Sequence, residues 1–133
     1  MTVKDNTQLI EIMTLLIKIQ VRSCTEDILA IEPMVKKVCP PFLKKGLIMC
    51  LDGLSGEYIK ETLQVEIDSS DTYNNILIEG CEMVGKQHYT RPGVMLETFK
   101  SHLSVENQSK LDSMARGLVK EFDEMCERGE VPN

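Results

Sequence analysis

Residues 7–22 restrict the fold of this chain more than any other segment, because their apolar side chains cover more than one face of a helix. Only two charged residues, Glu11 and Lys18, interrupt the run between residues 9 and 21. A helix that is apolar over most of its circumference is buried on several sides or pairs with another chain. Two arrangements therefore stay open: burial inside one domain, and a homo-oligomer formed through residues 7–22.

Helical periodicity continues through the rest of the chain. Apolar residues recur at helical spacing in six further segments: residues 28–38, 41–52, 55–67, 72–85, 92–103 and 104–129. No segment alternates between apolar and polar residues with a period of two, as a half-buried strand would. The sequence predicts an all-α fold, a compact bundle of six or seven short helices. Its 133 residues correspond to one domain, residues 1–133.

Several helix boundaries are predicted from residues that favour helix ends. Pro41 suits the first turn of a helix, and Gly53 suits the left-handed position after a helix. Ser55 is the expected N-cap of the next helix, and Thr25 is the expected N-cap after residues 7–22. Pro33 is expected to kink or restart its segment. These signals predict a central helix pair separated by a tight glycine turn.

Two glycines are predicted inside helices, where glycine costs about 1 kcal/mol relative to alanine. They are Gly46, in the first helix of the central pair, and Gly80, in the helix over residues 72–85. Close approach of a neighbouring backbone is the simplest compensation for that cost. We therefore expect the two helices to cross near Gly46 and Gly80, and we assign these two glycines and Gly53 a structural role.

The charge balance disfavours two classes of partner. The net charge of −6 disfavours nucleic acid and anionic membrane surfaces, because lysine and arginine drive binding to phosphate. No run of about eighteen uncharged apolar residues is present, so no direct membrane insertion is expected. One basic cluster stands out, and it suits either a solvated rim or a local binding patch: Lys36, Lys37, Lys44 and Lys45.

The cysteines indicate reduced thiols. The chain has five cysteines, an odd number, and no pair has CxxC spacing: Cys24, Cys39, Cys50, Cys81 and Cys126. The first residues carry no apolar segment of the signal-peptide kind. Together these features predict a cytoplasmic protein without disulfides.

No catalytic or metal-binding pattern is evident. The two histidines, His88 and His102, have no ligand partner at metal-binding spacing. Cys81 lies seven residues before His88, which allows a thiol–base pair, but Cys81 falls on the apolar side of its predicted helix and suits a core position better. The GLSG segment is too short for a phosphate loop. The sequence predicts no enzyme, no cofactor and no metal.

The central stretch resembles a known family. Residues 42–53, FLKKGLIMCLDG, are similar to the cytoplasmic loop of the flagellar motor stator family (MotA/TolQ/ExbB type), which has a Phe-Leu-basic-basic-Gly-Leu run ending in Asp-Gly. Residues 28–32, ILAIE, resemble the family's Leu-Leu-Ala-Leu-Glu segment, and residues 76–104 resemble its C-terminal tail. The three pieces occur in the family's order. Residues 28–68 thus resemble the stator cytoplasmic loop, and residues 72–104 the tail.

The resemblance implies a function without transmembrane helices. Stator proteins place membrane spans between these pieces, whereas here residues 69–70 fill the gap; the spans are absent in nature or have been removed. A chain without spans conducts no ions. The resemblance implies a non-enzymatic, soluble interaction domain that binds the flagellar rotor switch protein through charged residues. The candidate residues are Arg22, Glu32, Lys44 and Lys45.

Two departures from the family favour a second interpretation. Cys24 stands where the family has its rotor-contacting arginine, and Arg22 is two residues away. Asp27 stands where the family usually has glycine. The alternative is therefore a membrane-free paralogue that serves as an adaptor for a partner outside motility. The four candidate residues could equally be ordinary solvated charges with no binding role.

Overall fold

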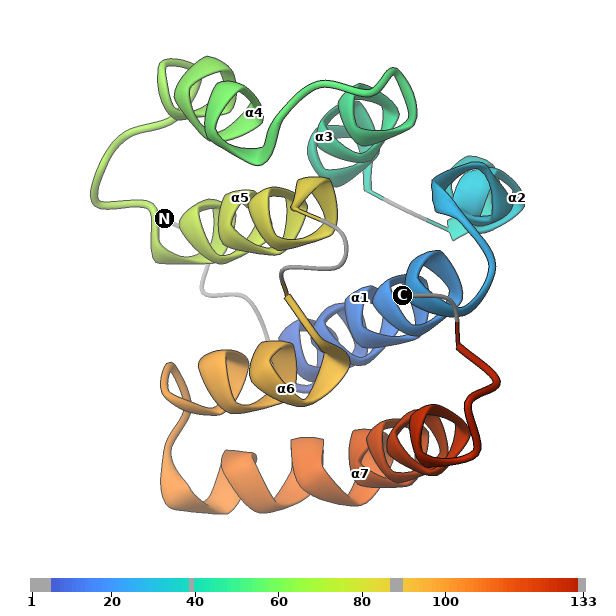
Figure 1. Ribbon diagram of the computed structural model, residues 1–133. Helices are drawn as coiled ribbons and strands as arrows, with labels where there is room; N and C mark the ends of the chain where they lie inside the picture. The colour runs from blue at the N-terminus through green and yellow to red at the C-terminus, as the bar shows by residue number, and fades with distance from the viewer. Residues whose placement is uncertain (1–5, 39, 87–89, 132–133) are drawn as a thin grey trace.

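The computed structural model describes residues 6–38, 40–86 and 90–131, and the predictions on Cys39 and His88 lie outside them. Within these ranges the chain forms seven α-helices, one 3-10 helix and no strand, which confirms the all-α prediction (Figure 1). The elements are α1 (Asn6–Thr25), η1 (Ile28–Ile31), α2 (Glu32–Val38), α3 (Pro41–Leu51), α4 (Gly56–Gln64), α5 (Thr72–Gly85), α6 (Pro92–Lys100) and α7 (Val105–Glu127).

Two helices, α1 and α5, organise the bundle. Helix α1 packs against η1, α5, α6 and α7, and α5 also packs against α3, α4 and α6. Figure 1 shows α3 and α4 on one side of α5, and α6 and α7 beyond α1. We call α3, α4 and α5 the α4 side, and α1, α6 and α7 the α7 side. The contact between α1 and α5 joins the two sides.

Helix α1 runs through the core of the molecule. Its central residues Met13, Leu16 and Ile17 are completely buried, and buried residues occupy several of its faces. Four elements of the same chain cover the apolar circumference that the sequence displays. Burial inside one chain therefore accounts for this pattern, and the homo-oligomer through residues 7–22 stays a prediction.

The segment after α1 differs from the prediction at its cap. Thr25 is the last residue of α1, and the cap of η1 is Asp27, whose side chain accepts a hydrogen bond from the Ala30 N–H at 3.1 Å. The prediction of Thr25 as the N-cap is therefore wrong. Pro33 is the second residue of α2, so the helix restarts there as expected, because a proline in the first turn loses no helical hydrogen bond.

The central helix pair confirms three predicted boundaries, at Pro41, Gly53 and Ser55, but α4 ends at Gln64, short of the predicted residue 67. Pro41 begins α3, and Gly53 follows it in the left-handed conformation with a φ of 83°. A side chain is strained in that conformation, so glycine suits this turn. Ser55 caps α4, since its hydroxyl accepts a hydrogen bond from the Tyr58 N–H at 3.2 Å.

The two mid-helix glycines are both buried, but they do not face each other. A Cβ atom on Gly46 would lie 2.4 Å from the sulfur of Cys81, so α3 crosses α5 at Gly46 as predicted. A Cβ atom on Gly80 would lie 2.6 Å from Cδ1 of Leu16 instead. Helices α3 and α5 thus cross near the two glycines as predicted, but Gly80 itself accommodates Leu16 of α1 and not Gly46.

A different glycine pair brings two backbones together. A Cβ atom on Gly85 would lie 3.0 Å from the Cα atom of Gly56, and a Cβ atom on Gly56 would lie 2.5 Å from the carbonyl oxygen of Glu82. The first residue of α4 therefore lies directly on the last turn of α5. No side chain larger than hydrogen fits at Gly56 without moving one of these helices.

The last two helices follow the predicted pattern. Pro92 begins α6, and Ser104 caps α7 by accepting a hydrogen bond from the Asn107 N–H at 3.3 Å. Helix α7 buries Leu111, Ala115 and Phe122 against the rest of the molecule. Among the helices in the described ranges, none combines the length and the apolar run that a membrane crossing requires.

Candidate functional site

The four predicted binding residues do not form one cluster. Arg22 lies in the last turn of α1 and pairs with Glu26 at 3.1 Å. Lys45 of α3 pairs with Glu66, which follows α4. These two residues therefore make local or inter-helix ion pairs of their own.

Glu32 and Lys44 both contact Lys36 of α2. Glu32 begins α2 and pairs with Lys36 one turn later, at 3.4 Å. The ammonium group of Lys44 lies 3.4 Å from the carbonyl oxygen of Lys36, in the last turn of α2. A cation at this position stabilises the negative end of the helix dipole, so Lys44 has a structural role as well as a charge.

These contacts place Lys44 beside Lys36, which is ion-paired with Glu32, and Lys37 is the next residue of α2. We define the α2–α3 basic patch as Lys36, Lys37 and Lys44. The two lysines of α2 are exposed, with 69% of the Lys36 side chain accessible. Lys37 has no ion-pair partner among the residues that the structure describes. Leu29 of η1 is also 63% exposed, and η1 packs against α2 and α3. An exposed apolar side chain thus lies on the element that packs against both helices of the patch.

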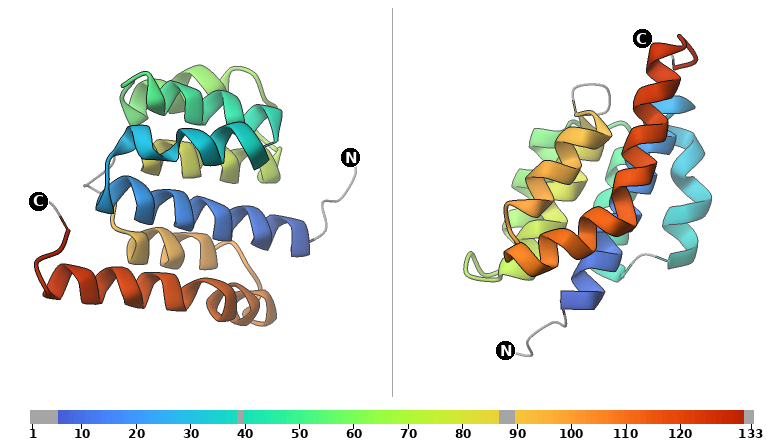
Figure 2. Two further views of the ribbon diagram at one scale, coloured as in Figure 1. Left: turned by 90° about the vertical axis from the view of Figure 1, so that its right-hand side faces the viewer. Right: turned by 90° about the horizontal axis from the view of Figure 1, so that it is seen from below.

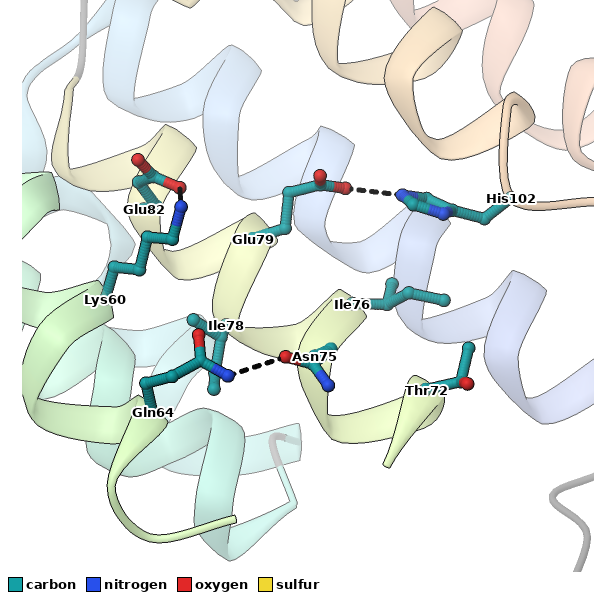
Figure 3. Close-up of a pocket in the computed structure, with 9 residues that line it drawn as sticks. All are labelled: Lys60, Gln64, Thr72, Asn75, Ile76, Ile78, Glu79, Glu82 and His102. Carbon is teal, nitrogen blue, oxygen red and sulfur yellow. Dashed lines mark hydrogen bonds and ion pairs between the residues drawn. The ribbon is translucent and has the colours of Figure 1, made fainter. Parts of the chain in front are cut away.

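A polar pocket of about 400 Å³ lies between α4, α5 and the turn after α6 (Figure 3). The amide of Gln64 donates to the Asn75 side-chain oxygen at 2.8 Å, and Glu79 contacts the His102 ring nitrogen at 2.8 Å. Lys60 lies 3.9 Å from Glu82. The polar groups of the pocket therefore interact with one another across its walls.

The closest carboxylate–imidazole contact of the pocket joins α5 to the turn after α6. Glu79 and His102 form a pair, and no group of three or more His, Cys, Asp or Glu side chains suited to a metal ion occurs in the described part of the chain. Sequence reasoning missed this pair because its members lie 23 residues apart on different elements. No local motif connects them, so only the packing of α5 against the turn after α6 brings them together.

Three of the four described cysteines are buried thiols. All four are free, and Cys126 is the partly exposed one. Burial raises the pKa of Cys50 to about 12 and that of Cys24 to about 11. Cys81 is 1% exposed and packs at the crossing of α3 and α5, so its position is that of a small core residue. His88, the base of the thiol–base pair that the sequence allows but does not favour, lies outside the described residues.

Comparison of the chain with models of known protein families, with characterised proteins and with solved structures found no match.

Proposed function

We propose that this chain is a non-enzymatic helical interaction domain that binds an acidic protein surface through the α2–α3 basic patch. The observation that carries the proposal is the collection of Lys36, Lys37 and Lys44 over two packed helices in a chain whose net charge is −6. A local patch of opposite sign to the whole molecule orients an approaching partner.

The exposed Leu29 of η1, the element that packs against α2 and α3, supports the same proposal. Charged residues at the edge of an interface set its specificity and association rate, whereas buried apolar anchors supply much of its affinity. Leu29, on an element that packs against α2, is positioned to be such an anchor. The proposed partner surface is thus acidic with an apolar depression.

The resemblance to the stator family supplies a specific partner for this proposal. Under it, the domain acts in the cytoplasm, and its partner is the flagellar rotor switch protein. A second candidate is an adaptor for a partner outside motility. The burial of Cys24, which is 3% exposed, favours that alternative. Cys24 occupies the position of the family's rotor-contacting arginine, and a buried thiol presents no charge to a rotor.

A charge-reversal experiment tests the patch. Lys36→Glu/Lys37→Glu should weaken binding to the purified rotor switch protein about tenfold or more at low salt. The matched control is Lys110→Glu/Lys120→Glu on α7, which changes the net charge equally at exposed positions and should leave binding within about twofold. Titration calorimetry provides the dissociation constants, and circular dichroism verifies that each variant is folded.

The outcomes separate the two candidate functions. Equal weakening by both double variants would contradict the patch, because net charge alone would then explain binding. Failure of the wild-type chain to bind the rotor switch protein would contradict the motor partner. Glu32→Lys adds a further comparison: a stator-type contact made by Glu32 weakens on this change, whereas binding of an acidic surface to the patch strengthens.

A further inference from the structure

The pocket between α4, α5 and the turn after α6 is lined by apolar and acidic side chains of the same helix, α5 (Figure 3). Ile76 is 3% exposed and Ile78 is 2% exposed, and both line the pocket. Glu79 and Glu82 also line it and lie three residues apart, so their side chains are neighbours on one face of α5. A cavity of about 400 Å³ with this lining is large enough for a small organic molecule.

Glu79 has one carboxylate oxygen that is available to a ligand. Its Oε1 atom lies 2.8 Å from the His102 ring nitrogen, and its Oε2 atom makes no hydrogen bond with another residue that the structure describes. The Glu79 side chain is about one-third exposed, so solvent reaches it. A molecule in the pocket can therefore bind Oε2 without breaking the contact between Glu79 and His102.

The ion pairs of Glu82 are long. Its carboxylate lies 3.9 Å from the Lys60 ammonium and 3.2 Å from the Lys86 ammonium. A charge-assisted hydrogen bond between such groups spans about 2.7–2.9 Å. The Lys60 side chain is 54% exposed, whereas that of Glu82 is 17% exposed, so the carboxylate is the more enclosed member of this pair. An ammonium group that is not tied to α4 can come closer to Glu82 than Lys60 does.

A second cavity makes the surroundings of the pocket more acidic. This cavity, of about 540 Å³, shares Lys60 and Glu82 with the first and is also lined by Glu57 and Glu61 of α4. With Glu79, carboxylates outnumber ammonium groups along the two cavities. A site of this charge attracts a cation and repels an anion. Within the described ranges these carboxylates belong to no group of three or more that suits a metal ion, which favours an organic cation.

We propose that this pocket binds a primary ammonium group carried on a short aliphatic chain. The ammonium donates hydrogen bonds to Oε2 of Glu79 and to the carboxylate of Glu82, and the aliphatic chain packs against Ile76 and Ile78. Free alkylamines and lysine side chains both have this chemistry. The pocket shares no residue with the α2–α3 basic patch, so the two sites take ligands of opposite charge and can be tested separately.

The probe is butylammonium chloride, titrated at pH 7 and low salt into the isotope-labelled full chain. We expect saturable shifts of the backbone amide resonances of residues 75–82, with a Kd of about 1 mM or below. Butanol and butyrate keep the aliphatic chain and change the head group, so each should bind about tenfold more weakly or not at all. The lysine analogue Nα-acetyl-lysine N-methylamide separates the two sources. Tighter binding of this analogue than of butylammonium assigns the site to a lysine side chain, and weaker binding assigns it to a free amine.

Glu79→Gln keeps the size of the side chain and removes its charge, so it should weaken butylammonium binding about fivefold or more. The matched control is Glu121→Gln at an exposed position of α7, and the left view of Figure 2 shows α7 and α4 at opposite edges of the molecule. It should leave the Kd within about twofold. Glu82→Gln replaces Glu79→Gln if the amide spectrum of that variant shows a lost fold.

Three results would overturn the proposal. Equal weakening by Glu79→Gln and Glu121→Gln would assign binding to net charge. Butanol that binds as tightly as butylammonium would reduce the pocket to an apolar hole. Shifts that do not saturate, or that avoid residues 75–82, would show that the ammonium group binds elsewhere.

Discussion

The α4 side and the α7 side bury their helices by different means. On the α4 side, glycines let backbone and side chains of neighbouring helices come into direct contact, at Gly46 and at the Gly56–Gly85 pair. On the α7 side, the large side chains of Phe99 and Phe122 fill the space between helices. Gly117 of α7 has no atom of another element within 4 Å of a Cβ position. A glycine in a helix therefore marks a close crossing at Gly46 and Gly56 on the α4 side, whereas Gly117 on the α7 side has open space around it.

This difference explains why the chain accepts glycines that weaken helices. A glycine inside a helix costs about 1 kcal/mol, and closer helix packing can offset that cost through added dispersion contacts. At Gly117 no such contact exists in the described structure. Substitution to alanine should therefore have opposite signs on the two sides.

The largest expected effect is that of Gly56→Ala. The new methyl group would meet the carbonyl oxygen of Glu82 at 2.5 Å, and a backbone atom cannot rotate away as a side chain can. We expect a loss of about 3 kcal/mol in the free energy of unfolding, from urea titrations followed by circular dichroism. Glu57→Ala, at the exposed next position, should change stability by less than about 0.5 kcal/mol. Equal losses of unfolding free energy for Gly56→Ala and Glu57→Ala would show that α4 does not pack closely against α5 at Gly56.

Gly46→Ala should have a smaller effect because the clash is with side chains. The methyl group would lie 2.4 Å from the Cys81 sulfur and 2.9 Å from Cδ1 of Leu63. We expect a loss of about 2 kcal/mol. Cys81→Ala removes the sulfur, so the double variant should recover about 1 kcal/mol relative to the sum of the single changes. Strict additivity in this double-mutant cycle would argue against the crossing at Gly46.

Gly117→Ala is the matched change on the α7 side and should stabilise the protein. Open space surrounds the added methyl group, and alanine favours a helix interior over glycine by about 0.8 kcal/mol. A gain of that size in urea unfolding would confirm that the helical cost of glycine is uncompensated here. A loss would indicate that an unrecognised partner packs at this position and would remove the contrast between the two sides.

The sequence predicts helices better than it predicts which helices touch. The helix over residues 72–85 has its predicted bounds, and Pro41, Gly53 and Ser55 act at the predicted helix ends. These features depend on local backbone preferences. Thr25 and Asp27 both have a short oxygen-bearing side chain that can cap a helix. Because α1 extends to Thr25, beyond its apolar pattern, the cap of the next helix is Asp27.

Contacts between helices escape such local rules. Sequence reasoning recognised that Gly46 and Gly80 need a neighbour, but it could not identify Cys81 and Leu16 as those neighbours. The candidate site shows the same limit: Lys44 was predicted from its charge, whereas its contact with α2 depends on how α2 and α3 pack. Periodicity indicates which face of a helix is buried, and it carries no information on the partner of that face.

The smallest expected effect concerns the surface of the α7 side, where Asp112 joins α6 to α7. Its carboxylate lies 2.8 Å from the Arg116 guanidinium and 3.0 Å from the Lys100 ammonium. Hydrogen bonds from Arg116 and from Lys100 lower the pKa of Asp112 below its usual value of 3.8. A carboxylate whose pKa is lower in the folded state stabilises that state at pH values above its unfolded pKa, and this contribution is lost as the pH falls through the folded pKa.

Asp112→Asn should therefore reduce the free energy of unfolding at pH 7, by less than about 1 kcal/mol because the pair is partly exposed. In urea titrations from pH 7 to pH 3, the difference in the free energy of unfolding between Asp112→Asn and wild type should shrink as the pH drops below about 4. A difference that stays constant with pH would assign the effect to the shape of the side chain, and the α7 side would then depend on packing alone.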